Sequence, residues 1–285
     1  MLLVDLGNSR LKWSMHHGPR VVRGVLTLVS GNWDALRLHE DWSNALSELG
    51  CRAQPLESAL CSSADEERTN KCMDLLVGFC QRPSERLRTM GLWELREGFN
   101  HVVLRNDYTS PQQLGDDRWV LAMGLAATPS VWPDKSSWRI SLVSAGTATV
   151  IDYVEGTQSE LRGGFYSLSF RGGFILPGFA QMRGALLTST SEVAPRWQAE
   201  AGLASQPGLS TAEGVERGLA MAQLGPLTMM GRPDAILVTG GGALEFLAAY
   251  RSLLEPQWRL AAQYLPMLMD AGLRAGLESL KASTS

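Results

Sequence analysis

Two short stretches 139 residues apart share one pattern, and this repeat constrains the possible folds more than any other feature. Residues 3–9 (LVDLGNS) and 142–148 (LVSAGTA) each give an apolar strand, a polar residue, one intervening residue, glycine, and then small hydroxyl or amide residues. Their separation is close to half of the 285-residue chain. A match this short also arises by chance, so the elements around it must agree as well.

Hydrophobic spacing predicts a similar order of elements in both halves. The first half gives strands at 2–4, 11–14, 20–29, 56–62, 86–89 and 102–104, and helices at 33–49, 65–79 and 116–127. After an exposed loop at 128–137, the second half gives strand-turn-strand at 141–153, a strand region at 161–175, helices at 181–188 and 212–230, a strand at 235–239 and a helix from 244. We therefore predict an α/β protein of two like domains, residues 1–114 and 115–285.

The first turn of the repeat has the chemistry of a phosphate site. Asp5 follows an apolar strand, and Gly7-Asn8 is a turn pair that favours a hairpin. Backbone amides in such a turn approach an oxyanion closely, and a carboxylate beside them suits a hard cation. A plain hairpin with a capping aspartate gives the same pattern, so this stretch alone leaves both interpretations open.

A third glycine turn lies at residues 236–243 (ILVTGGGA), where an apolar strand leads into a helix. Backbone without side chains at the end of a strand admits a flat or phosphorylated ligand, and the helix N-terminus that follows favours an anion. A flexible strand-to-helix turn is the alternative. Three glycine turns, two of them in repeated halves, together indicate a nucleotide cleft between two domains of like fold.

Composition argues against several classes of partner. The net charge is −3, and no cluster of Lys and Arg alternates with aromatic residues, so nucleic acid is not expected as a partner. None of the four cysteines forms a C-x-x-C pair, which favours free buried thiols over a zinc site. Asp5 breaks the first apolar run, and no later run approaches a membrane span of about 20 residues. We expect a cytoplasmic protein without a membrane partner.

Taken together, the motifs resemble those of the type III pantothenate kinases, a family of the acetate and sugar kinase, heat-shock chaperone and actin superfamily. The first phosphate motif of the family is matched by Asp5, Gly7, Asn8, Ser9 and Lys12, and the substrate motif by Tyr108, Pro111, Gly115, Asp117 and Arg118. The second phosphate motif corresponds to Ser144, Gly146, Thr147 and Ala148, and the Gly-Gly-x-Ile-x-Pro-Gly run to residues 172–178. The resemblance extends from residue 2 to about residue 276.

The resemblance implies two tandem actin-like (ribonuclease H-like) domains with a nucleotide cleft, ATP-dependent phosphorylation of pantothenate as the first step of coenzyme A biosynthesis, and a homodimer. Asp117 would be the catalytic base. Pantothenate would contact Tyr108, Gly115, Asp116, Arg118 and Thr211. ATP would contact Asp5, Leu6, Gly7, Asn8, Ser9, Arg10, Leu11, Lys12, Thr147, Gly240 and Gly241, with Mg²⁺ at Asp5. Helix capping by Asp116 and Asp117 is the competing explanation for the acidic pair.

One position departs from the family pattern. Ser144 stands where the family usually has an aspartate that binds a monovalent cation. A serine hydroxyl is a weaker ligand for K⁺ or NH₄⁺ than a carboxylate, so we expect a weakened cation requirement. Two other functions stay open: a catalytically weak member that acts as a transcription accessory protein, as some relatives named Bvg accessory factors imply, or a superfamily kinase for another small alcohol or carboxylate.

Overall fold

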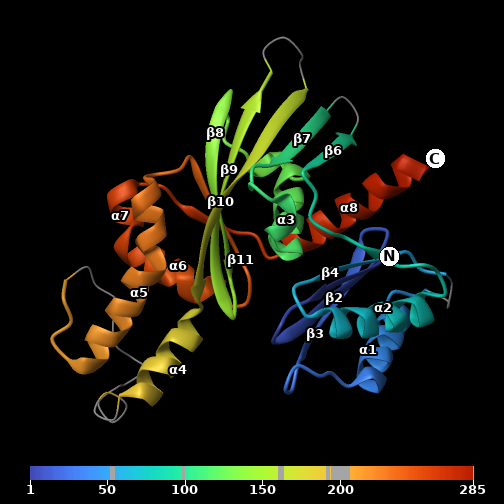
Figure 1. Ribbon diagram of the computed structural model, residues 1–285, viewed down its shortest axis with the longest axis horizontal. Coiled ribbons are helices and arrows are strands. Elements are labelled where there is room, and N and C mark those ends of the chain that lie inside the picture. The colour runs from blue at the N-terminus through green and yellow to red at the C-terminus, as the bar shows by residue number, and fades with distance from the viewer. Residues whose placement is uncertain (52–54, 98–99, 160–163, 191–192, 194–205, 285) are drawn as a thin grey trace. The chain divides into compact units, whose positions relative to one another are not determined.

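The structure, a computed structural model, describes residues 1–51, 55–97, 100–159, 164–190, 193 and 206–284, and it contains two compact units (Figure 1). Unit 1 combines Met1–Val131 with Leu268–Ser285, and unit 2 is Trp132–Met267. These bounds differ from the predicted domains 1–114 and 115–285, because the last helix of the chain packs on the helix that starts at Asp116.

Unit 1 contains a five-stranded sheet, a hairpin and four helices. Its strands are β1 (Leu2–Leu6), β2 (Arg10–His17), β3 (Arg20–Thr27), β4 (Ser58–Ser62), β5 (Glu85–Arg86), β6 (Leu92–Glu97) and β7 (Asn100–Asn106). Its helices are α1 (Ala35–Glu48), α2 (Glu66–Cys80), α3 (Asp116–Ala126) and α8 (Leu268–Thr284), with short 3₁₀ turns η1 (Pro111–Gln113) and η2 (Pro129–Val131). The sheet order is β3-β2-β1-β4-β5, with β1 to β3 antiparallel and β4 and β5 parallel to β1.

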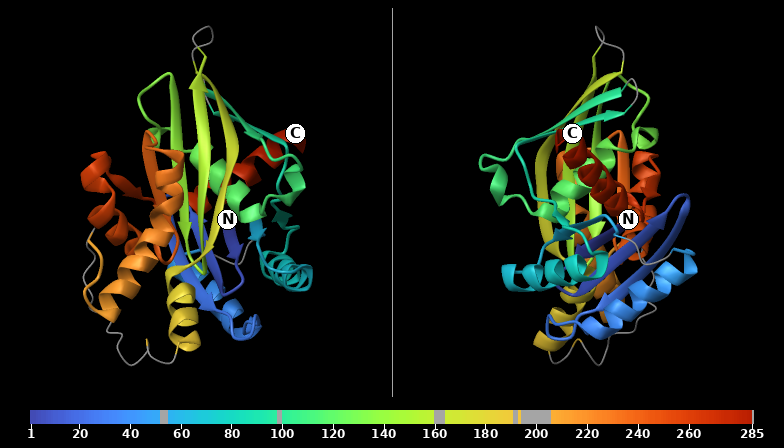
Figure 2. Two further views of the ribbon diagram at one scale, coloured as in Figure 1. Left: turned by 60° about the vertical axis from the view of Figure 1, so that its left-hand side comes forward. Right: turned by 90° about the vertical axis from the view of Figure 1, so that its right-hand side faces the viewer.

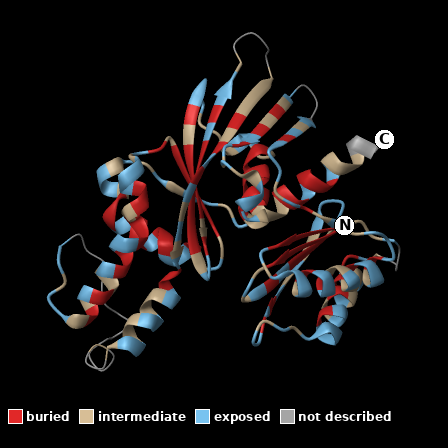
Figure 3. Cartoon of the chain, in the orientation of Figure 1, coloured by how far each residue is buried: buried red, intermediate tan, exposed pale blue. Residues whose placement is uncertain are grey.

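The strands β1 and β4 are buried along their whole length (Figure 3). Leu2, Val4 and Leu6 belong to one hydrophobic core with residues of α1 and α2. Successive strand side chains point to opposite faces, so Leu3 and Asp5 face the other side. Helices α3 and α8 pack on that side of β1 and β4 (Figure 2). This arrangement explains why a carboxylate follows an apolar strand: Asp5 faces the helix that carries Asp117.

Helices α3 and α8 approach each other closely because glycines replace side chains at their contact. A Cβ at Gly272 would lie 1.9 Å from the carbonyl oxygen of Val120, and a Cβ at Gly124 would lie 2.1 Å from that of Leu268. Neither distance is possible for a real side chain, so these two positions require glycine. Helix α3 is buried from Arg118 to Ala126 as a result.

We predict that Gly272→Ala lowers the free energy of unfolding by about 2 kcal/mol, because overpacking against backbone outweighs the better helix propensity of alanine. Gly78→Ala in α2 is the matched control, since a Cβ there meets nothing within 4 Å. It should raise stability slightly. Thermal unfolding of the two variants against the wild type checks this, and equal melting temperatures for the two variants would contradict it.

Unit 2 repeats the sheet of unit 1. Its strands are β8 (Ser137–Ala145), β9 (Ala148–Gln158), β10 (Phe165–Pro177), β11 (Ala235–Thr239) and β12 (Ala262–Tyr264), and its helices are α4 (Phe179–Ser189), α5 (Thr211–Met230), α6 (Ala243–Leu253) and α7 (Glu255–Trp258). The order β12-β11-β8-β9-β10 has β8 to β10 antiparallel and β11 and β12 parallel to β8. Helices α5 and α6 share a core with one face of this sheet (Figure 2).

The predicted internal repeat is confirmed by topology. Strands β1 to β5 and β8 to β12 have the same order and the same directions, and Asp5 and Ser144 occupy equivalent places next to the ends of β1 and β8. The predicted strand region at 161–175 appears as β10 from Phe165; its start at 161 lies outside the described residues. The exposed loop was predicted too long, because β8 already begins at Ser137.

Two further expectations concern cysteines and membranes. Among the described residues, Cys61, Cys72 and Cys80 are buried free thiols, as predicted, and Cys51 is half-buried. No helix in the described part of the chain combines the length and the apolar character needed to cross a bilayer.

Candidate active site

Asp5 is a nearly buried carboxylate at the end of β1, with 9% of the residue exposed. It pairs in register with Lys12 of β2, whose ammonium Nζ lies 3.1 Å from Asp5 Oδ2. Hairpin pairing therefore brings two residues of the predicted first phosphate motif into direct contact. An anionic and a cationic group side by side at the end of a strand suit the binding of a metal together with phosphate.

Asp117 lies in the first turn of α3 and is half-buried. Its side chain folds back over the turn, where Oδ1 accepts a hydrogen bond from the Arg118 backbone N–H at 2.9 Å. A Cβ at Gly115 would lie 2.7 Å from this oxygen, so Gly115 leaves room for the carboxylate. Burial, and then the negative charge of Asp5, raises the pKa of Asp117. Such a carboxylate takes up a proton more readily than an exposed one, as a general base must.

Arg118, next to Asp117, is buried and contacts a second predicted substrate residue. Its Nη1 donates a hydrogen bond to the hydroxyl of Tyr108 at 2.7 Å, and its guanidinium carbon lies 5.5 Å from the centre of the Tyr108 ring. Residues from a loop and from a helix start are thus joined beside the acidic pair. A guanidinium held in one orientation is well suited to bind a carboxylate.

Asp116 has different neighbours from Asp117. Its Oδ1 accepts a hydrogen bond from the backbone N–H of Thr89 at 2.7 Å. The single hydroxyl proton of Thr89 is shared between Asp116 Oδ1 at 3.0 Å and the carbonyl oxygen of Leu114 at 2.9 Å. These bonds tie the start of α3 to the segment after β5. The geometry favours a positioning role for Asp116, and its contact with substrate stays a prediction.

The turn between β1 and β2 is closed by a hydrogen bond from the Gly7 N–H to the Arg10 carbonyl at 2.9 Å. The hairpin prediction is confirmed, but neither Gly7 nor Asn8 has a positive φ, so this is not the two-residue mirror-type turn that such a pair usually forms. Leu6 and Leu11 pair with each other and are fully buried, so their contact with ATP stays a prediction.

Three glycine segments of the second half lie together in unit 2. A Cβ at Gly178 would lie 2.2 Å from the Gly146 carbonyl oxygen, and the Gly178 N–H donates to the Thr147 carbonyl at 2.8 Å. A Cβ at Gly240, which has a φ of +96°, would lie 2.2 Å from the carbonyl oxygen of Ala145. The second phosphate turn is therefore packed between the end of β10 and the Gly240-Gly241-Gly242 turn, which the sequence had placed in three separate motifs.

Ser144 and Thr211 complete the predicted residues of unit 2. Ser144 is half-buried and lies opposite Val150 of β9 and Thr239 of β11, one residue before the end of β8. Thr211 is the first residue of α5, and the preceding Ser210 caps that helix by accepting a hydrogen bond from the Glu213 N–H. Thr211 itself is thus not the cap.

The carboxylate of Asp5 fits a magnesium ion whose remaining ligands are phosphate and water oxygens. No group of three or more His, Cys, Asp and Glu side chains in the described residues converges to hold a metal. Mg²⁺ in phosphotransferases is held by one or two carboxylates and otherwise by water and substrate phosphates. Asp5 meets that requirement, and its charge near Asp117 is one that a cation would offset.

Three residues near the predicted site were not singled out from the sequence. Thr89 binds Asp116, as described above. Cys61 pairs in register with Asp5; burial, and then the charges of Asp5 and Asp117, raises the pKa of its thiol, which stays protonated. Arg68 of α2 reaches the Asn8 turn. The apolar strand that contains Cys61 could be recognised in the sequence. The contacts of Thr89 and Arg68 could not, because they join residues far apart in the chain.

Comparison with a solved structure agrees with this architecture. A putative 2-dehydro-3-deoxygalactonokinase from Sinorhizobium meliloti superposes with a TM-score of 0.50 over 99% of this chain and 98% of that one, at 16% identity. The predicted fold class, an α/β chain of two like domains, is confirmed.

Sequence relatives give the particular family. The model of the family described as type III pantothenate kinase matches residues 1–232. The type III pantothenate kinase of Bordetella pertussis is 30% identical over 99% of this chain and 97% of its own length, and that of an Azoarcus species is 29% identical over 85% and 80%. The chain belongs to the type III pantothenate kinase family.

Proposed function

We propose that this protein transfers the γ-phosphoryl group of ATP to the primary hydroxyl of pantothenate, which gives 4'-phosphopantothenate, the first step of coenzyme A biosynthesis. Membership of the family supports the reaction. The observation that carries the mechanism is the half-buried Asp117, with a raised pKa, close to the charge of Asp5 and next to the buried Arg118.

The reaction divides among these side chains. The hydroxyl oxygen of pantothenate forms a bond to the γ-phosphorus, the bond from phosphorus to the oxygen of ADP breaks, and the hydroxyl proton passes to the Asp117 carboxylate. Arg118 and Tyr108 orient the pantothenate carboxylate, and Thr211 contacts its other polar groups. Asp5 would hold Mg²⁺, which neutralises charge on the phosphates when bound.

ATP is assigned to residues of both repeats. The Gly7 and Gly146 N–H groups close their own turns, with the Arg10 and Ala148 carbonyls, so phosphate is assigned to the other amides of the two turns. The absence of a side chain at Gly7 and Gly146 eases its approach. Lys12 adds a positive charge at the first turn. The glycines at 240 and 241 suit the nucleoside, since a flat base approaches backbone without a side chain. We also infer a homodimer in the cytoplasm, for which light scattering in solution tests the dimer.

The test is ATP-dependent phosphorylation of pantothenate, followed by ADP release and by mass spectrometry of the product. Pantothenol, in which a hydroxymethyl group replaces the carboxylate, is the matched control substrate. It should react far less efficiently, because it lacks the negative charge that the Arg118 guanidinium is proposed to bind. Absence of turnover with pantothenate, in a protein that still binds ATP, would refute the substrate.

The serine at position 144 leads to a prediction about cations. A neutral hydroxyl binds K⁺ more weakly than a carboxylate, so replacing choline chloride by KCl or NH₄Cl at equal ionic strength should change the rate little. Ser144→Asp should introduce a K⁺-dependent rate, because it adds the charged ligand that the family usually has. Strong activation of the wild type by K⁺ would contradict this prediction.

A further inference from the structure

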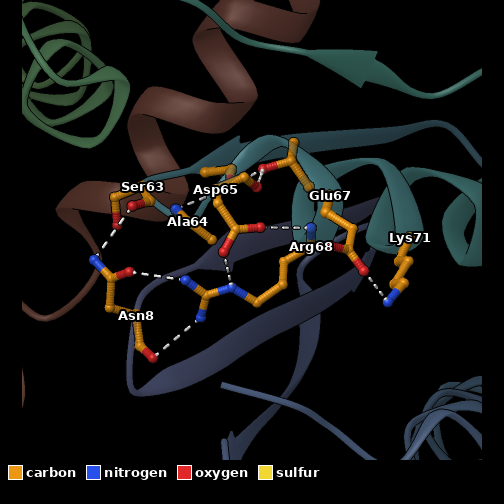
Figure 4. Close-up of polar contacts among 9 residues, drawn as sticks. Asn8, Ser63, Ala64, Asp65, Glu67, Arg68 and Lys71 are labelled. Carbon is orange, nitrogen blue, oxygen red and sulfur yellow. Dashed lines mark hydrogen bonds and ion pairs between the residues drawn. The ribbon is translucent and has the colours of Figure 1, made fainter. Parts of the chain in front are cut away.

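Arg68, in the first turn of α2, reaches across to the turn between β1 and β2. Its Nη2 donates a hydrogen bond to Asn8 Oδ1 at 3.1 Å, and its Nη1 lies 3.5 Å from the Asn8 carbonyl oxygen (Figure 4). The two residues are 60 positions apart in the chain. This contact joins α2 directly to the predicted first phosphate motif.

The guanidinium is held on its other side by Asp65, the N-cap of α2. Arg68 Nε donates to Asp65 Oδ2 at 2.7 Å, and the Arg68 backbone N–H donates to Asp65 Oδ1 at 2.9 Å. These hydrogen bonds, the backbone bond first, lower the pKa of Asp65, so that carboxylate stays charged. Gly31 packs over the guanidinium, since a Cβ there would lie 3.1 Å from Nη1. Only 19% of the Arg68 side chain is exposed.

Asn8 is held at both ends of its amide. While Oδ1 accepts from Arg68, Nδ2 donates to the carbonyl oxygen of Ser63 at 3.2 Å. The Asn8 side chain therefore cannot rotate without loss of two bonds, one of them to a charged donor. Hydrogen bonds to charged groups are about twice as strong as neutral ones, so Arg68 contributes most to this restraint.

We propose that Arg68 is a positioning residue for ATP, which acts through Asn8 to hold the Gly7-Asn8-Ser9 turn in the conformation that accepts phosphate. The proposal rests on the proposed function of that turn. A turn fixed before binding does not lose conformational entropy when phosphate arrives, and this raises the affinity for nucleotide.

Direct binding of an anion by Arg68 fits the surroundings less well. The adjoining pocket, about 320 Å³, is lined by Ser30, Gly31, Asn32, Asp65, Glu67, Arg68 and Lys71. Two carboxylates in this lining pair with the two cations, Asp65 with Arg68 and Glu67 with Lys71 at 2.6 Å. The pocket thus offers no net positive charge, and the contact with Asn8 is the feature that connects Arg68 to ATP.

The test compares Arg68→Met with Lys71→Met, which removes the same charge one turn further along α2 but has no contact with Asn8. Calorimetry with Mg²⁺ and a non-hydrolysable ATP analogue gives the affinity. We expect roughly tenfold weaker binding for Arg68→Met, which corresponds to about 1.4 kcal/mol, and wild-type binding for Lys71→Met. The KM for ATP should rise in parallel, the KM for pantothenate should not change, and Arg68→Lys should restore part of the affinity.

A double mutant shows whether Arg68 acts through Asn8. Asn8→Ala alone should weaken nucleotide binding, and addition of Arg68→Met should then weaken it no further. Additive losses, or analogue binding by Arg68→Met within twofold of the wild type in a protein that keeps its melting temperature, would overturn the proposal. Analogue binding needs no pantothenate. If the wild type binds the analogue but does not phosphorylate pantothenate, pantothenate is not the substrate. The binding comparison between Arg68→Met and Lys71→Met still tests the role of Arg68 in that case.

Discussion

Replacing Asp117 with asparagine is expected to lower kcat for pantothenate phosphorylation by about 10²–10⁴-fold, the usual contribution of a general base. Asparagine keeps the shape of the side chain and the acceptor for the Arg118 N–H, which lies 2.9 Å from Oδ1. It removes the negative charge and, with it, the ability to take the proton of the substrate hydroxyl. Steady-state kinetics with ATP and pantothenate measure the effect, and the KM for ATP should change little.

The fold of this variant should be at least as stable as that of the wild type. The pKa of Asp117 is raised in the folded protein by burial and by the charge of Asp5, so its ionised form disfavours folding at neutral pH. This destabilisation appears as the pH rises above the pKa that Asp117 has in the unfolded chain. It disappears at lower pH, where the carboxyl group is protonated in both the folded and the unfolded state. A neutral asparagine avoids it. Undiminished turnover in Asp117→Asn would contradict its assignment as the base.

The pH profile offers an independent check on the same residue. A base must be deprotonated to act, and a raised pKa moves that requirement to higher pH. The wild-type kcat/KM for pantothenate should therefore fall on the acid side at a pH above the ordinary range of an aspartate. The small residual rate of Asp117→Asn should lack this fall. A wild-type profile that stays flat down to the ordinary aspartate range would contradict the raised pKa.

Loss of Asp5 is expected to impair ATP use most severely. Asp5→Ala removes the carboxylate proposed to hold Mg²⁺ and leaves the ammonium of Lys12, now 3.1 Å from that oxygen, without its partner. Charge stabilisation through a metal is worth several kcal/mol, so kcat/KM for ATP should fall on the order of 100-fold or more. The matched control is Asp74→Asn, an exposed aspartate of α2. It should leave the rate unchanged.

Magnesium titrations separate metal binding from general damage. If Asp5 holds the ion, the activity that remains in Asp5→Asn should need a higher Mg²⁺ concentration for half its maximum, whereas Asp74→Asn should follow the wild type. The same loss of rate with an unchanged Mg²⁺ requirement would assign Asp5 another role.

Much of the fold was predictable because its signals are local. The Gly7-Asn8 turn and the alternation in β1 and β2 are short-range features, and the pattern shared by residues 3–9 and 142–148 identified the repeat that the two sheets confirm. The neighbours of Asp117 were also anticipated in part, since Arg118 and Tyr108 do meet. These residues are at most ten positions apart.

The other parts of the fold and of the candidate site depend on contacts between residues far apart in the chain, which the spacing of residues in the sequence does not predict. Thr89 and Asp116 are 27 residues apart, and Arg68 and Asn8 are 60 apart. Helix α8 was not predicted from the sequence, and Gly272 and Gly276 weaken its helical signal. In the folded protein those same glycines admit the backbone of α3 and the side chains of Leu87 and Met123. Tertiary packing here overrides local propensity.

The position of α8 also determines the order in which the protein can mature during synthesis. A ribosome completes residues 1–131, which carry Asp5, Asp117 and Arg118, before any of unit 2, and α8 emerges only after residue 267. Until then α3, buried from Arg118 to Ala126 in the finished unit, lacks the helix that packs on it. A nascent chain halted before α8 would therefore expose apolar surface and be a substrate for chaperones and proteases. Asp117, the proposed base, is thus made early, yet the structure that supports it is complete only once α8 has formed.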